Sequence, residues 1–150
     1  MAKALSSHDV FSFLRPQQIK KVSEVSEVIS VKAGNPVFSH GEPSEFLFAV
    51  LEGAVRLQLP RGNEEDLKIE DLSTGILFGS CMCFDRKSYA LTAVALEDAR
   101  VLKIDAAGFK KVMDDDLTVG YPVQRMISRT YFSRYLETMK KLQLMGESVL

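Results

Sequence analysis

The stretch that decides the fold covers residues 31–57 and reads Val31-Lys-Ala-Gly34-Asn-Pro-Val-Phe38-Ser-His-Gly41-Glu-Pro-Ser-Glu-Phe46-Leu-Phe-Ala-Val-Leu51-Glu-Gly53-Ala-Val-Arg-Leu57. Short apolar runs alternate here with turn signals that contain Gly34, Gly41 and Gly53. Tight turns between strands often need a positive φ, which glycine adopts without strain. The stretch therefore predicts several short strands joined by tight turns, as in a sandwich or a barrel.

The same pattern continues on both sides and covers residues 24–105. Val55, Leu57 and Leu59 alternate with polar residues, which is typical of a strand with one buried face. The chain carries further turn signals at Arg61-Gly62-Asn63, Thr74-Gly75 and Phe78-Gly79. This central zone is therefore predicted to be β throughout.

Helical patterns flank the β zone at residues 9–23 and 105–145. Asp105 can cap a short first helix after the strands, and a longer helix is expected after the acidic run that ends at Asp116. Pro122 predicts an irregular first turn or a kink in that longer helix. The order of elements is thus helix, strands, helices.

Length and composition limit the classes of function. The chain has 150 residues, 46% hydrophobic and 26% charged, with a formal net charge of −1. This predicts one domain over residues 1–150 and no direct contact with nucleic acid, because there is no basic excess to bind phosphates. The start of the chain resembles no secretory signal, and no run approaches the ~20 apolar residues of a membrane span. A cytoplasmic location away from membranes is expected.

Three segments together resemble a cyclic-nucleotide-binding domain: residues 31–57, 72–79 and 90–105. They are similar to the sensor domains of the catabolite-activator (Crp/Fnr-like) family of bacterial regulators, over about residues 11–143. The resemblance implies a mainly β fold: an antiparallel, jelly-roll-like β-roll (a double-stranded β-helix) with short N-terminal helices and a long C-terminal helix. It also implies a regulatory ligand-sensing module that is not an enzyme, and the chain is too short to add a DNA-binding domain.

The phosphate-binding cassette of that family is degenerate in this sequence. The family's cassette reads Phe-Gly-Glu, then a short helix, then an Arg followed by small residues; the Glu binds the ribose and the Arg binds the phosphate. Ser80 stands in the place of the Glu, and Tyr89 stands in the place of the Arg. Losing both contacts should cost on the order of 4 kcal/mol, about a thousandfold in affinity. Tight binding of cyclic AMP or cyclic GMP is therefore not expected.

The resemblance places the ligand pocket at residues Phe78, Gly79, Ser80, Cys81, Tyr89 and Ala90, with Arg86 as an auxiliary residue. Backbone N–H groups after Phe78 and the Tyr89 hydroxyl would bind a cyclic nucleotide or another small anion; no metal is expected. Arg86 has the alternative of being a solvated loop residue. Cys81 and Cys83 are either reactive thiols or, with more weight, small buried fillers.

An apolar stripe on the C-terminal helix indicates a partner. Phe132, Tyr135, Met139 and Leu142 recur at spacings of three, four and three, which places them on one helix face. The stripe is predicted to be the seam of a homodimer. The alternative is that the helix folds back and packs the stripe against its own roll.

Two other classes of function stay open. The roll could be a ligand-free scaffold or dimerisation protein, with its pocket filled by Tyr89 and Met82. A cupin-like barrel enzyme is the third class, but the chain has only two histidines, His8 and His40, and neither has a plausible metal partner nearby. No catalytic residue is assigned.

Overall fold

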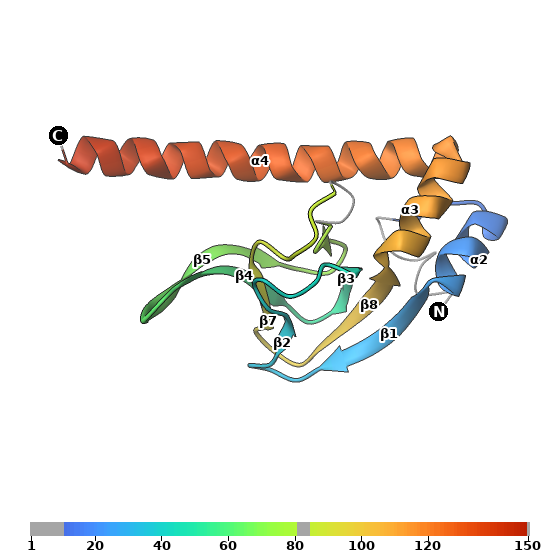
Figure 1. Ribbon diagram of the computed structural model, residues 1–150, viewed down its shortest axis with the longest axis horizontal. Coiled ribbons are helices and arrows are strands. Elements are labelled where there is room, and N and C mark those ends of the chain that lie inside the picture. The colour runs from blue at the N-terminus through green and yellow to red at the C-terminus, as the bar shows by residue number, and fades with distance from the viewer. Residues whose placement is uncertain (1–10, 81–84, 150) are drawn as a thin grey trace.

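The computed structural model describes residues 11–80 and 85–149. The elements in chain order are α2 (Pro16–Glu24), β1 (Ser26–Val31), β2 (Pro36–Phe38), β3 (Phe46–Glu52), β4 (Val55–Arg61), β5 (Glu64–Leu72), β6 (Leu77–Phe78), β7 (Thr92–Ala95), β8 (Ala99–Asp105), α3 (Ala106–Asp115) and α4 (Leu117–Val149). Figure 1 shows α4 across the top of the molecule, the strands below it, and α2 and α3 on the right.

The strands form two antiparallel four-stranded sheets, with the orders β1-β8-β3-β6 and β2-β7-β4-β5. Strands β3 and β4 follow one another in sequence but lie in different sheets, because the chain crosses over at Gly53. The predicted antiparallel β-roll with flanking helices is therefore confirmed. The strand zone runs from Ser26 to Asp105, close to the expected residues 24–105.

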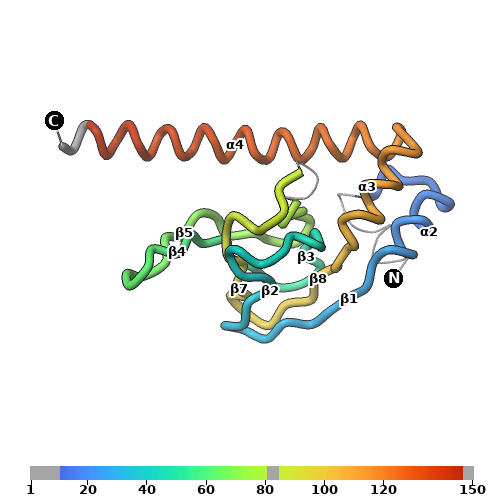
Figure 2. Tube along the Cα trace, in the orientation of Figure 1, coloured from blue at the N-terminus to red at the C-terminus, as the bar shows by residue number. Residues whose placement is uncertain are grey.

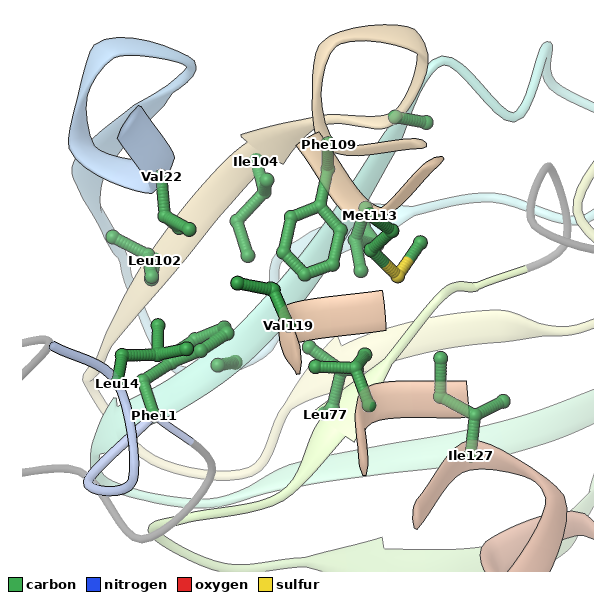
Figure 3. Packing of buried hydrophobic residues seen from close by; sticks show 14 of the residues in the cluster. Phe11, Leu14, Val22, Leu77, Leu102, Ile104, Phe109, Met113, Val119 and Ile127 are labelled. Atoms are coloured by element: carbon green, nitrogen blue, oxygen red, sulfur yellow. The ribbon is translucent and has the colours of Figure 1, made fainter. Parts of the chain in front are cut away.

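Two clusters of buried side chains hold these layers together. One fills the space between the first sheet and the helices (Figure 3), and it includes Phe11, Val22, Leu102, Ile104 and Phe109. The other lies inside the roll and is built on stacked rings. Each large apolar side chain buried in this way contributes about 1.5–3 kcal/mol to the stability of the fold.

The rings inside the roll form one stack. Phe38 lies 3.9 Å from Tyr89 and 5.7 Å from Phe48 between ring centroids, and Phe48 lies 5.5 Å from Phe78. Phe48 and Phe78 are also cross-strand neighbours of β3 and β6. This aromatic stack lies next to the candidate site, and two of its rings, Phe38 and Phe78, line it.

Helix α3 begins as the sequence predicts, because the Asp105 carboxylate accepts a hydrogen bond from the N–H of Gly108 at 2.8 Å. Helix α4 differs from the prediction: it is unbroken from Leu117 to Val149, with Pro122 inside it. Pro122 lies in the second turn, so the helix loses a single hydrogen bond near its start and continues.

The length of α4 carries it well beyond the roll. Its 33 residues span about 50 Å, and Figure 2 shows it crossing over the strands and extending past the β4–β5 hairpin. Its buried side chains Val119, Val123 and Ile127 recur every four residues on the face turned to the roll. From residue 128 to residue 146 no described side chain is fully buried.

Candidate functional site

A pocket with a cavity volume of about 120 Å³ lies between the roll and α4. Its described lining comes from the end of β2, from β4, from the turn and strand around β6, from the two residues before β7, and from one face of α4. The lining residues are Phe38, Leu57, Gly75, Ile76, Leu77, Phe78, Gly79, Ser80, Ala90, Leu91, Met126, Ile127, Thr130, Tyr131 and Arg134. The wall is mostly apolar, and its polar side chains are concentrated on Ser80 and α4.

The turn after β6 aims Ser80 at α4. Gly79 has a φ of +74°, and a Cβ atom built there would lie 3.1 Å from Phe38 and 3.3 Å from Phe48. A side chain at Gly79 would thus be strained and would press on the ring stack. Because the chain turns here, Ser80 is only 4% exposed, and its hydroxyl lies 3.3 Å from the hydroxyl of Tyr131.

The α4 side of the pocket is a single helix face. Met126, Ile127, Thr130, Tyr131 and Arg134 are spaced by one, three, one and three residues, which brings them together on a helix of 3.6 residues per turn. Ile127 is buried and anchors this face on the roll. The polar residues that follow it, Thr130, Tyr131 and Arg134, therefore line the pocket, although Tyr131 is also 38% exposed.

Arg134 is bound to the roll by an ion pair. Its Nη2 and Nε atoms donate to the same oxygen, Oε2 of Glu70 on β5, at 2.6 and 3.0 Å. The Arg134 guanidinium also lies 5.1 Å from the centroid of the Tyr131 ring. Only 17% of the Arg134 side chain is exposed, against 40% for Glu70. The pair ties α4 to the second sheet at the edge of the pocket.

The neighbouring residue on β5 makes a separate pair. Asp71 Oδ1 accepts a hydrogen bond from Arg56 Nε at 2.7 Å, and Lys68 lies 3.2 Å from Asp71 Oδ2. The hydrogen bond from Arg56 is the largest cause that lowers the pKa of the Asp71 carboxyl to about 2. Asp71 therefore stabilises the β4–β5 pairing and is not part of the pocket lining.

The structure brings four of the predicted site residues together in the pocket wall: Phe78, Gly79, Ser80 and Ala90. Cys81 lies outside the described residues, as do Met82 and Cys83. Arg86 is exposed, and its Nε donates to the backbone oxygen of Ser88 at 3.1 Å. Arg86 is not among the described lining residues.

Tyr89 stands behind the pocket wall. It is 3% exposed, and its ring stacks on Phe38, which does line the pocket. Its hydroxyl donates to the backbone oxygen of Phe46 at 2.6 Å and lies 3.2 Å from the Phe46 nitrogen, which donates to it. Tyr89 is thus turned into the core, and Ala90 and Leu91, which follow it, line the pocket.

The sequence did not predict the side of the pocket formed by α4, which includes Thr130, Tyr131 and Arg134. It also did not predict Glu70, the partner of Arg134. A signal was present, because Ile127, Thr130 and Arg134 follow the buried Val123 at helical spacing. That signal identifies the inner face of the helix but not the strand that this face meets. The contact with the β6 turn exists only in the folded chain.

The predicted stripe lies on another face of α4. Phe132, Tyr135, Met139 and Leu142 are 60%, 56%, 41% and 53% exposed, so they do not pack on the roll of the same chain.

Within the described residues, none of the helices has the length and apolarity required to cross a membrane.

Comparison with known proteins agrees with this architecture. A curated relative, a "CRP-like cAMP-activated global transcriptional regulator" of Mycobacterium tuberculosis, is 22% identical over 131 residues, which cover 86% of this chain and 58% of the relative. This chain spans less than two thirds of the length of the curated relatives that it matches.

Two solved structures share the fold. The sensor domain of the transcriptional regulator DNR from Pseudomonas aeruginosa is 21% identical, with a TM-score of 0.73 over 87% of this chain and 92% of that one. The regulatory subunit of a cAMP-independent protein kinase A from Trypanosoma brucei is 18% identical, with a TM-score of 0.75 over 93% of this chain and 49% of that one.

The family model that matches is the cyclic nucleotide-binding domain, over residues 28–116. The match covers more than half of the 150 residues and takes in the strands of the roll together with α3. Its span includes β6, the turn at Gly79 and the residues before β7, which form the roll side of the pocket. The resemblance found in the sequence is confirmed, and the chain belongs to the cyclic nucleotide-binding domain family.

Proposed function

We propose that this chain is a regulatory module that senses a small ligand in the pocket beneath α4 and does not bind cyclic AMP or cyclic GMP tightly. The observation that carries the proposal is the position of the cassette side chains. Ser80 faces the pocket without a carboxylate, and Tyr89 is turned into the ring stack. The described roll side of the pocket therefore offers neither of the charged groups that the family uses for ribose and phosphate.

The size of the expected loss supports this reading. A charge-assisted ribose contact and an arginine–phosphate pair together contribute on the order of 4 kcal/mol, so their absence weakens binding about a thousandfold. A solved structure that shares this fold is named as the regulatory subunit of a cAMP-independent protein kinase A, so the fold also occurs in a protein described as independent of cAMP. A sensor of another ligand is the function that these features favour.

The exposed stripe on α4 supports a homodimer as the working state. Phe132, Tyr135, Met139 and Leu142 form a continuous apolar seam at coiled-coil spacing beyond the last buried residue, Ile127. Exposed apolar patches of this extent mark interaction surfaces in soluble proteins. We assign the seam to a second copy of α4, in a cytoplasmic module that makes no direct contact with nucleic acid.

A thermal-shift experiment tests the proposed function. With 1 mM cyclic AMP or cyclic GMP, a millimolar binder gains only about 0.4 kcal/mol, which raises Tm by about 1–2 °C. A micromolar binder would gain about 4 kcal/mol and a rise of roughly ten degrees. The proposal predicts the small shift for both nucleotides, and a rise of ten degrees with either of them contradicts it.

The competing function is a scaffold whose fold is retained without any ligand. A scaffold gains no stability from a small molecule, whereas a sensor is stabilised by its ligand through mass action. Tyr89 does not fill the pocket as the scaffold reading requires, since it lies behind Phe38. A broad screen of small anions and neutral molecules on the same thermal-shift assay separates the two functions.

A further inference from the structure

The pocket contains a charge that the cassette does not supply. Among its described lining residues, Arg134 carries the only charged side chain; the others are apolar, glycine, serine, threonine or tyrosine. Arg134 comes from α4 and not from the roll. A guanidinium that is 17% exposed at the edge of an apolar cavity is an anion-binding group in a setting where water screens it weakly.

We propose that the pocket binds a small organic anion with an apolar body about the size of one ring, and that Arg134 binds its anionic group. This inference rests on the proposed sensing function and names the class of ligand. The roll side and the α4 side of the pocket contribute different groups. The roll provides the apolar surface, and α4 provides the charge.

The dimensions of the pocket set the size of the apolar body. The cavity volume is about 120 Å³, comparable with an engineered apolar cavity of about 150 Å³ that holds benzene. Phe38, Leu57, Leu91 and Ile127 are among the apolar side chains around it. A purine, a ribose and a cyclic phosphate together need far more room than one ring.

Arg134 retains donors for a ligand. A guanidinium has five N–H groups, and the two hydrogen bonds to Glu70 use one on Nε and one on Nη2, both directed at a single carboxylate oxygen. An anion can therefore bind the remaining N–H groups or replace Glu70. The hydroxyls of Ser80 on the roll and Tyr131 on α4 lie 3.3 Å apart in the same pocket.

Glu70 acts as the internal counter-ion of Arg134. It is 40% exposed, so its pairing with Arg134 is a partly solvated contact that an incoming carboxylate can displace. Glu70 also repels any anion that enters the pocket. Neutralising Glu70 should therefore strengthen anion binding, whereas neutralising Arg134 should weaken it. These opposite effects of the two partners distinguish a binding role from a merely structural ion pair.

The test measures binding of four probes to the whole chain at pH 7 by calorimetry: benzoate, phenylacetate and their neutral amides. We expect at least one carboxylate to bind at least tenfold more tightly than its amide. Arg134→Gln should lose at least tenfold of that affinity, which is the usual scale for one charge-assisted contact. Glu70→Gln should gain severalfold.

Controls make the outcome specific. Arg129→Gln removes an exposed arginine of the same helix that does not line the pocket, and it should leave affinity unchanged. Arg134→Lys keeps the positive charge and should restore part of the affinity that Arg134→Gln loses, because the proposal assigns anion binding to that charge. Far-ultraviolet circular dichroism confirms that each variant is folded.

Three results would overturn the inference: no carboxylate binds, carboxylate and amide bind equally, or Arg134→Gln binds as well as the natural chain. The proposed function fails on a different observation, micromolar binding of cyclic AMP or cyclic GMP. The two failures are therefore distinguishable in the same set of titrations.

Discussion

Tyr89 is the residue on which the account of the cassette depends. We propose that it stands at the position of the family's arginine, while its ring lies 3.9 Å from Phe38 and its hydroxyl bonds to both backbone groups of Phe46. Sequence spacing is the basis of that proposal. It cannot predict the side-chain direction, since that depends on the room left between Phe38 and β3.

Replacing Tyr89 by phenylalanine tests this role. The ring stack survives, but the N–H and C=O groups of Phe46 lose a hydrogen-bond partner in a partly buried site, which should cost about 1–2 kcal/mol. Urea unfolding of both proteins measures the difference. Tyr121→Phe, at an exposed position of α4 outside the stripe, is the matched control and should change stability by less than about 0.5 kcal/mol. A Tyr89→Phe variant as stable as the natural chain would contradict the assigned role.

Asp71 gives a prediction that depends on pH. Because its pKa in the folded protein is lowered to about 2, below its value in the unfolded chain, its ionised form stabilises the fold above pH ~4. This contribution is lost as the pH falls from there through about 2. Asp71→Asn should therefore destabilise the protein at pH 7, by no more than about 1 kcal/mol since both partners are about one third exposed.

The measurement is urea unfolding of the natural chain and Asp71→Asn at pH 7, 4 and 2.5. The difference between the two proteins should shrink as the pH falls. Glu97→Gln, at an exposed turn residue, is the control and should show no such trend. A difference that stays constant down to pH 2.5 would show that the Arg56–Asp71 pair is not its source.

At the scale of elements, α4 performs two tasks with two faces. The face that carries Ile127 and Arg134 closes the pocket, and the face that carries Phe132 and Met139 lies in solvent. Apolar periodicity in the sequence predicts both the helix and the exposed stripe. It does not predict the pocket face, because Thr130 and Arg134 become pocket residues only through the place where α4 crosses the β6 turn.

The dimer is tested by placing charges in the stripe. Met139→Glu with Leu142→Glu would bury two carboxylates in the seam and remove apolar contacts worth about 1.5–3 kcal/mol per side chain. The natural chain should sediment as a dimer in analytical ultracentrifugation, and the double variant as a folded monomer at the same concentration. Lys141→Glu, outside the stripe, should leave the dimer intact. A monomeric natural chain, or a dimeric double variant, would contradict the seam.

At the scale of the whole molecule, the roll has the fold of the cyclic nucleotide-binding domain family. Turn glycines and alternating strands are local signals, which is why the sequence predicts the order of strands and the helices that flank them. Part of the roll side of the candidate pocket follows from that order, since Phe78, Gly79, Ser80 and Ala90 lie in the matched segments. The α4 side comes from a helix docked from outside the matched residues, and local sequence patterns carry no information about that docking.

The most direct test of the central claim is calorimetric titration of the natural chain with cyclic AMP. A pocket whose roll side has Ser80 and a core-facing Tyr89 in place of the charged pair should bind it with a Kd near or above the millimolar range. A Kd in the micromolar range would contradict the account, because it would mean that tight binding needs neither a carboxylate at position 80 nor an arginine at position 89.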